Sequence, residues 1–224
     1  MTSLHNRYHQ KSIRISPDGF SFCRIDGNKS KTADFPVETG ALITVEAERF
    51  FTPGDQITVI SATDSPLLIP TEIYDEYRVF DYLKLHTDTS LVAKTYTETI
   101  GEYTALCYLT QEKKNAIEKL GDSAVLRHES SLFFQFLKDS NCKEAVLVSQ
   151  NPSFFDLMVI HKGSLQLLNR FMLSNAEDTL YYILNTMKQF KIKSPDIFIV
   201  RECRTADKVA ELLKSMKITP TVIQ

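Results

Sequence analysis

The chain has 224 residues, which suffice for one large domain or two small ones, and its 43% hydrophobic and 24% charged residues are ordinary for a globular protein. A formal net charge of −2 gives no field strong enough to favour nucleic acid or an anionic membrane as a partner, and we expect no nucleic-acid partner. The seven glycines are about half the usual share, so phosphate sites built from glycine-rich backbone have few places to form.

Cysteine spacing and hydropathy favour a cytoplasmic protein. No two of the four cysteines are close enough in sequence to form a CxxC metal or redox motif, so we expect reduced thiols at positions 23, 107, 142 and 203. The first residues, MTSLHNRYHQKS, contain no apolar core of a signal peptide. No apolar run approaches the roughly 18–20 residues that cross a bilayer, so we expect no direct membrane insertion.

The first elements are predicted as strands. Residues 12–16 and 20–25 alternate apolar and polar side chains on either side of the turn Pro17-Asp18-Gly19, and a third strand is expected around 33–37. Residues 39–51 are ambiguous, because β-branched residues favour a strand while the apolar spacing also suits a helix. Strands are then expected at 57–61 and 67–69.

The middle of the chain mixes helices and strands. Thr71 is expected to begin a helix with one apolar face, formed by Ile73, Tyr77, Phe80 and Leu83. A strand pair follows at 91–97 and 103–109. Helices are predicted after Thr110, ending at Gly121, and at 129–139, with a short strand at 124–127 between them.

The last third has the clearest pattern. Strands at 144–150 and 154–161 precede a tight turn at Lys162-Gly163 and a third strand at 164–173. Ser174 and Glu177 have the spacing of a capping box, which predicts a helix to about Phe190. A strand at 196–200, a helix from Thr205 and a final strand at 220–224 complete the order β-β-β-α-β-α-β, which predicts a mixed sheet covered by helices.

The opening of the chain repeats this pattern weakly. The segments IRIS (13–16) and FSFCRI (20–25) match VLVS (146–149) and FFDLMVI (154–160) in order and in the glycine that follows. We therefore expect two halves, residues 1–141 and 142–224, with an inserted subdomain around 70–130 in the first half.

Two such units resemble the actin-like ATPase fold of actin, sugar kinases and Hsp70. The segments SIRISPDGFSF (12–22), FFDLMVIHKGSLQLLNRF (154–171) and EDTLYYILN (177–185) are similar to a bacterial family of uncharacterised actin-like proteins. Similar architecture is found in the actin-like cytoplasmic parts of pilus-assembly and type II secretion proteins. The resemblance implies a duplicated α/β fold of the ribonuclease H-like type, with two mixed sheets flanked by helices.

The resemblance also says where a nucleotide would bind. In active members the first turn of each half carries an Asp-x-Gly motif whose backbone N–H groups hold phosphates, while an Asp helps to position Mg²⁺. Here the first turn holds Asp18 and Gly19, but Pro17 makes it an ordinary turn sequence. The second turn, 149–153, has no glycine and no acidic residue, and proline removes one donor. Residues 201–204, where a glycine pair would approach adenosine, also lack glycine. We expect the nucleotide site to be lost.

Three functions follow from these observations. We expect a non-catalytic actin-like scaffold or protein-interaction module without cofactor, catalytic residue or metal site, whose partner is another protein or a second copy of the chain. The alternative is an actin-like ATPase or switch with a degenerate site, binding ATP with magnesium through Asp18 and Gly19. A third reading is a small-molecule sensor that binds in the cleft between the halves.

Individual polar residues are expected to have structural roles. Asp156 alternates within an apolar strand, so it faces solvent or pairs with a neighbour. Asp178 favours the amino end of its helix electrostatically. Tyr181 and Tyr182 are adjacent on that helix, so one can face the core while the outer one is open to an interface. His128-Glu129 lacks the second histidine of a zinc-protease motif.

Overall fold

The computed structural model describes residues 10–17, 19–26, 29–35, 40–52, 54–121, 124–173, 175–201 and 203–223. The chain divides into two compact units, His5–Leu132 and Phe133–Gln224, which we call the first and second unit. The expected limits of the two halves stay a prediction.

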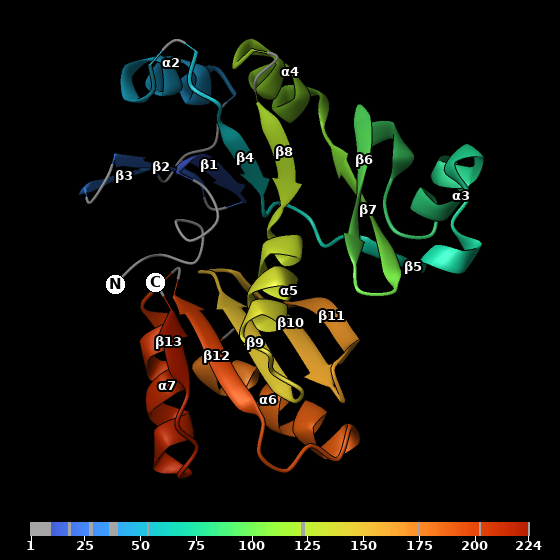
Figure 1. The fold of residues 1–224 in the computed structure, drawn as a ribbon, viewed down its shortest axis with the longest axis vertical. Helices are drawn as coiled ribbons and strands as arrows, with labels where there is room; N and C mark the ends of the chain where they lie inside the picture. The colour runs from blue at the N-terminus through green and yellow to red at the C-terminus, as the bar shows by residue number, and fades with distance from the viewer. Residues whose placement is uncertain are drawn as a thin grey trace. The chain divides into compact units, whose positions relative to one another are not determined.

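The first unit is built on a five-stranded mixed sheet (Figure 1). β1 (Lys11–Ser16), β2 (Gly19–Asp26) and β3 (Lys29–Phe35) form an antiparallel meander. β4 (Thr58–Ser61) lies parallel to β1, and β8 (Val125–His128) lies parallel to β4, which gives the order β3-β2-β1-β4-β8. β3 begins earlier than the expected 33–37, because all seven of its residues pair with β2.

Helix α2 (Gly40–Phe50) resolves the ambiguous segment 39–51. Its buried side chains Ile43, Ala47 and Phe50 recur at helical spacing and pack in one core with the sheet residues Ile13, Phe22 and Val59. Burial of this face outweighs the weak strand preference of β-branched residues, because strand propensity largely reflects packing. α4 (Gln111–Lys119) packs beside α2.

Residues 62–110, which we call the insert, lie between β4 and α4 and form a second, antiparallel sheet in the order β5-β7-β6. Its strands are β5 (Leu67–Pro70), β6 (Lys94–Ile100) and β7 (Tyr103–Leu109). Short helical segments connect β5 to β6: η1 (Thr71–Ile73), η2 (Glu76–Arg78), α3 (Val79–Leu83) and η3 (Thr89–Leu91).

The helix expected from Thr71 is broken, and that prediction is wrong. Tyr74 and Asp75 are extended, and the Asp75 carboxylate accepts a hydrogen bond from the Tyr77 backbone N–H at 2.9 Å, so helical structure restarts at this point. Of the expected apolar face, only Leu83 is buried. The other members are exposed by more than half: Ile73 by 65%, Tyr77 by 91% and Phe80 by 57%.

The second unit contains a five-stranded sheet with the same order and the same strand directions as the first. Its order is β11-β10-β9-β12-β13, with β9, β10 and β11 antiparallel in sequence and with β12 parallel to both β9 and β13. The strands are β9 (Ala145–Gln150), β10 (Phe154–His161), β11 (Ser164–Met172), β12 (Asp196–Arg201) and β13 (Thr221–Ile223). Two mixed sheets flanked by helices confirm the predicted α/β class.

Both faces of this sheet carry helices. α6 (Ala176–Gln189) and α7 (Thr205–Ser215) cover one face, where Ile183 and Val209 pack in one core with Val146 and Ile199. On the opposite face Phe136 of α5 (Glu129–Asp139) meets the ring of Phe198 edge-on, with centroids 5.1 Å apart. None of the helices in the described ranges is long and apolar enough to cross a membrane.

In the second unit the predicted hairpin turn is confirmed, whereas the capping box of α6 lies one residue later than predicted. Lys162 and Gly163 have φ angles of 54° and 80°, as a two-residue hairpin turn with both residues left-handed requires. The capping box of α6 is formed by Asn175 and Asp178, not by Ser174 and Glu177. Ser174 itself lies outside the described residues.

Candidate functional site

The first expected phosphate turn joins β1 to β2. Ser16 and Gly19 form the last pair of the ladder, and the Ser16 hydroxyl donates to the Gly19 carbonyl at 3.2 Å. Gly19 has a φ of 135°, a region that strongly favours glycine. The geometry therefore accounts for Gly19 as a turn residue. Asp18 lies outside the described residues, and the role of both in nucleotide binding stays a prediction.

The corresponding turn of the second unit joins β9 to β10. In its backbone the Asn151 N–H donates to the Phe154 carbonyl at 3.0 Å, and Pro152 has no N–H. The Ser153 carbonyl accepts from the Leu173 N–H at 3.0 Å, which ties the turn to the chain after β11. These bonds hold the turn as a closed hairpin connection.

Gln150, the last residue of β9, links the strand to both covering helices. Its side-chain carbonyl accepts from the Thr179 hydroxyl of α6 at 3.0 Å. Its backbone carbonyl accepts from the Cys203 thiol, just before α7, at 3.4 Å. Gln150 is fully buried, and its side-chain NH₂ has no acceptor among the described residues. The carboxyl end of β9 is thus held by polar contacts within the second unit.

Charged side chains lie at the end of β12 and just after it, in the segment 201–204. Arg201 pairs with Asp207 in the first turn of α7, with Nη2 and Oδ2 2.8 Å apart. Arg204 occupies the N-cap position of α7 without a side-chain capping bond and is exposed. Glu202 lies outside the described residues.

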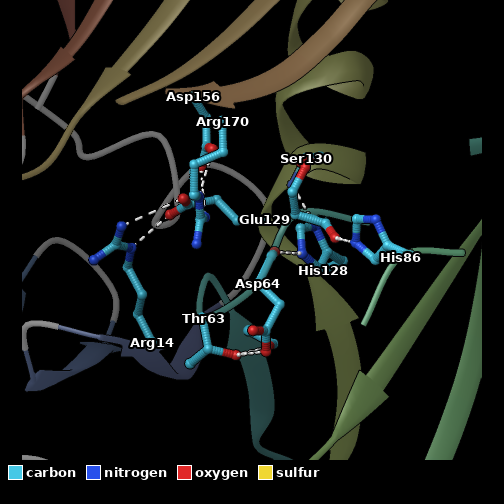
Figure 2. Close-up of polar contacts among 11 residues, drawn as sticks. Arg14, Thr63, Asp64, His86, His128, Glu129, Ser130, Asp156 and Arg170 are labelled. Carbon is cyan, nitrogen blue, oxygen red and sulfur yellow. Dashed lines mark hydrogen bonds and ion pairs between the residues drawn. The ribbon is translucent and has the colours of Figure 1, made fainter. Parts of the chain in front are cut away.

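Asp156 is paired with a neighbour, which confirms one of the two expected alternatives. It lies in β10, an interior strand, and its carboxylate receives two hydrogen bonds from Arg170 of β11, each 2.8 Å long (Figure 2). The Arg170 guanidinium also lies over the Phe154 ring, 3.8 Å from its centroid. Both side chains are largely buried, so this fork-shaped pair is a fixed part of the second unit.

A second buried ion pair, which the sequence analysis missed, lies in the first unit. Arg14 of β1 donates through Nε to Glu129 Oε1 at 2.5 Å and through Nη2 to Oε2 at 3.3 Å (Figure 2). Glu129 begins α5, where the helix dipole favours a negative charge. The only sequence signal was a charged residue between Ile13 and Ile15 in a strand whose polar face also proves to be buried.

His128 is a structural residue next to this pair. Its Nε2 lies 2.8 Å from the Asp64 carbonyl, and its Nδ1 accepts from the Ser130 N–H at 3.1 Å (Figure 2). These partners fit a neutral imidazole that carries its proton on Nε2. Asp64 in turn accepts from the hydroxyls of Thr63 at 3.0 Å and Tyr108 at 3.1 Å.

The titratable side chains of the described residues are engaged or buried in several places. Among them no three His, Cys, Asp or Glu residues gather as a metal site. Burial raises the pKa of the Cys23 thiol to about 11 and raises the pKa of Cys107 as well, so both thiols are poor nucleophiles at neutral pH. The buried carboxylates of Glu129 and Asp156 are engaged by arginines.

A search of curated proteins finds no match, whereas solved structures match over nearly the whole chain. A protein from Bacteroides thetaiotaomicron with an actin-like ATPase fold and unknown function is 17% identical, with a TM-score of 0.74 over 97% of this chain and 92% of that one. A chain of the PilM–PilN type IV pilus biogenesis complex is 10% identical, with a TM-score of 0.58 over 96% and 88%. The protein has the actin-like ATPase fold, as predicted.

A third match is weaker. The ethanolamine utilization protein EutJ from Carboxydothermus hydrogenoformans is 8% identical, with a TM-score of 0.49 over 96% of this chain and 84% of that one.

The family model described as "Protein of unknown function (DUF3822)" matches residues 2–215, and the chain therefore belongs to this family.

Proposed function

We propose that the protein is a non-catalytic, actin-like interaction module that works in the cytoplasm by binding another protein. One observation carries the proposal: the turn between β9 and β10 lacks the features of a phosphate-binding turn. The Asn151 N–H is bonded to Phe154, Pro152 has no N–H, and neither a glycine nor an acidic residue is present between 149 and 153.

The end of β12 and the residues just after it support the same interpretation. A glycine there allows close approach of a ligand to the backbone, whereas Arg201 and Arg204 bring long charged side chains. Arg201 is already paired with Asp207. Two of the three places that a nucleotide would need are therefore occupied by residues of another kind.

Protein binding is supported by one structural neighbour. The PilM–PilN structure is a complex of two proteins, so a protein of this fold can work by holding a partner. An exposed sheet edge offers one means of association, because β13 ends the second unit's sheet and leaves one side of its backbone without a strand partner among the described residues.

The alternative is an ATP-binding switch with a degenerate site. It is favoured by the turn sequence Asp18-Gly19 and by the left-handed φ of Gly19, because these two features match one of the expected phosphate motifs. In this alternative the backbone near Gly19 would hold phosphate, and Asp18 would help to position Mg²⁺.

Quantitative co-purification tests the proposal. The tagged full chain is isolated from the cells that make it, and the proteins it retains are then purified and rebound to the pure chain with and without MgATP. We expect a stoichiometric partner whose Kd does not change with nucleotide. A chain that retains and rebinds no partner, or a pure chain that hydrolyses ATP, would contradict the proposal.

A further inference from the structure

β11 is the most open sheet edge in the described part of the chain. Six strands end the three sheets there, and β5, β8 and β13 have only three or four residues each. β3 carries three charged residues and β6 carries two. β11 has nine residues, no proline and one charged residue, Arg170. Short length and charge normally keep an edge strand from pairing with another chain, whereas β11 is long and nearly uncharged.

The one charge of β11 is matched inside the second unit. Arg170 makes two hydrogen bonds of 2.8 Å to Asp156 of β10, and its side chain is 14% exposed. The bulge that shifts the ladder between β10 and β11 lies at Gln166, near the turn. Residues 167–172 therefore form a regular edge segment that presents no unmatched charge to an incoming strand.

The backbone of this segment directs hydrogen-bonding groups to the open side at alternate residues. The Leu173 N–H donates to the Ser153 carbonyl at 3.0 Å, one pair beyond Phe154 and Met172. Hydrogen-bonded and non-hydrogen-bonded pairs alternate in an antiparallel ladder, so Leu168 and Met172 belong to pairs that are not bonded to β10. Their N–H and C=O groups point away from β10, to a side on which the described residues place no paired strand.

Apolar side chains border this edge on both faces of the sheet. On one face Phe171 packs against Tyr182 of α6, with ring centroids 4.1 Å apart, and the Tyr181 ring lies 5.4 Å from that of Tyr182. On the opposite face lies Met172, the next residue along the strand. Met172 and Tyr181, exposed by 76% and 62%, are the two most exposed large hydrophobic side chains in the described part of the second unit. Their position indicates that the β11 edge is a contact surface.

We propose that β11 pairs with β11 of a second copy of the chain, antiparallel and across a twofold axis, so that two five-stranded sheets join into one. The inference does not depend on the function proposed above. Of the possible registers we assign the one centred on Asn169, because the strand is complementary to itself there. This register places the two Asn169 amides opposite each other and Phe171 beside Leu167 of the second copy.

Charge supports this register and this occupant. With Asn169 at the centre, Arg170 lies beside Leu168 of the second copy, whereas a pairing centred on Arg170 would bring two guanidinium groups together. The other side chains of β11 are uncharged, so two copies meet without opposing like charges. An extended segment of another protein is the competing occupant, and a measurement of mass separates it from a second copy.

Sedimentation equilibrium of the full chain tests the dimer. We expect a reversible species of twice 25.6 kDa. Asn169→Lys/Met172→Lys replaces two exposed side chains and sets lysines opposite each other, so the Kd of dimerisation should rise at least ~10-fold. Gln189→Lys/Met216→Lys makes the same change of charge at exposed positions outside β11 and should keep the wild-type Kd. Circular dichroism and Tm of both variants should match the wild type, which excludes loss of fold as the cause.

Disulfide trapping tests the register. In Asn169→Cys the two new thiols face each other in a non-hydrogen-bonded pair with Cα atoms about 4.5 Å apart, a distance that a disulfide spans. Mild oxidation with diamide should therefore give a covalent dimer on a non-reducing gel, and reduction should return it to monomer. In Met172→Cys the two new thiols lie about 20 Å apart along the paired strands, so its yield of dimer should stay at the wild-type level.

Each other result contradicts a definite statement. A chain that stays monomeric at every concentration, or a lysine variant of β11 that dimerises as tightly as the wild type, would overturn the β11 dimer and leave the interaction function intact. Cross-linking through Met172→Cys instead of Asn169→Cys would overturn the register. A monomeric wild type whose co-purified partner is lost in Asn169→Lys/Met172→Lys would show that the occupant is another protein and not a second copy.

Discussion

Asn175 and Asp178 begin α6 with reciprocal hydrogen bonds. The Asp178 N–H donates to Asn175 Oδ1 at 2.9 Å, and the Asn175 N–H donates to Asp178 Oδ2 at 3.2 Å. We expect Asn175→Ala to lower the free energy of unfolding by about 1 kcal/mol. Urea denaturation of both single variants and the double variant measures this. If the double variant loses the full sum of the single losses, the two bonds do not act as one cap.

We expect the Asp156–Arg170 pair to contribute more to the free energy of unfolding than the cap of α6 does. Asp156→Asn leaves the guanidinium charge buried without its carboxylate, so we expect a loss of roughly 3–5 kcal/mol in the free energy of unfolding. The double variant Asp156→Leu/Arg170→Met removes both charges and should lose much less. Chemical denaturation compares them, and equal losses in the two variants would show that the charge is not the cause.

The buried thiol of Cys23 makes the free energy of unfolding depend on pH above neutrality. Burial raises the pKa of its thiol to about 11 in the folded state, so the folded protein holds its proton more tightly than the unfolded chain. The resulting stability is fully present below the unfolded pKa of about 8.5 and is lost as the pH rises towards the folded pKa. We expect the unfolding free energy of the wild type to fall more steeply than that of Cys23→Ala between about pH 8 and pH 10.5. Parallel curves in urea titrations would contradict the raised pKa.

At the scale of elements, the hairpin between β10 and β11 depends on its turn. Gly163, at a φ of 80°, should resist substitution, so Gly163→Ala is expected to lower stability by about 1 kcal/mol although a Cβ added there would meet no atom within 4 Å. Lys162 has a φ of 54°, and Lys162→Gly should not destabilise to the same extent. Thermal denaturation of the two variants checks this contrast, and a Gly163→Ala protein with wild-type Tm would contradict it.

Sequence patterns predicted the elements that have repeated apolar spacing and missed those decided by one polar contact. The strands of the two five-stranded sheets and helices α4 to α7 were predicted from their apolar patterns, whether one face is buried, as in the helices, or both faces are, as in β9 and β10. The helix expected from Thr71 was wrong, because Asp75 restarts the helix and the run buries only part of the expected face. The α6 cap lies one residue later because Asn175, not Ser174, adopts the N-cap position.

The two buried ion pairs were harder to predict from the sequence, one because of strand register and the other because of sequence separation. A two-residue turn at Lys162-Gly163 alone would pair Asp156 with Asn169 across the hairpin. A bulge between Val159 and Ile160 shifts the ladder by one residue and places Arg170 opposite Asp156. Arg14 and Glu129 are 115 residues apart, so only the tertiary fold brings them together.

At the scale of the whole molecule, the chain contains one sheet plan twice. Both five-stranded sheets have the order 3-2-1-4-5 in their own strands, with the same directions, and the insert adds a third sheet to the first unit. The predicted internal repeat therefore has a structural counterpart in the two sheets. Fold alone does not determine function, so the function of this protein depends on the turns and surfaces that the shared fold carries.

Thermal denaturation of the full chain with millimolar MgATP tests the central claim most directly, since a ligand present at 100 times its Kd adds about 2.7 kcal/mol to the free energy of unfolding. We expect the same Tm with and without MgATP, because in the turn between β9 and β10 the Asn151 N–H is already bonded to Phe154 and Pro152 has no N–H. A saturable rise in Tm with nucleotide concentration would contradict a non-catalytic interaction module and favour the ATP-binding switch.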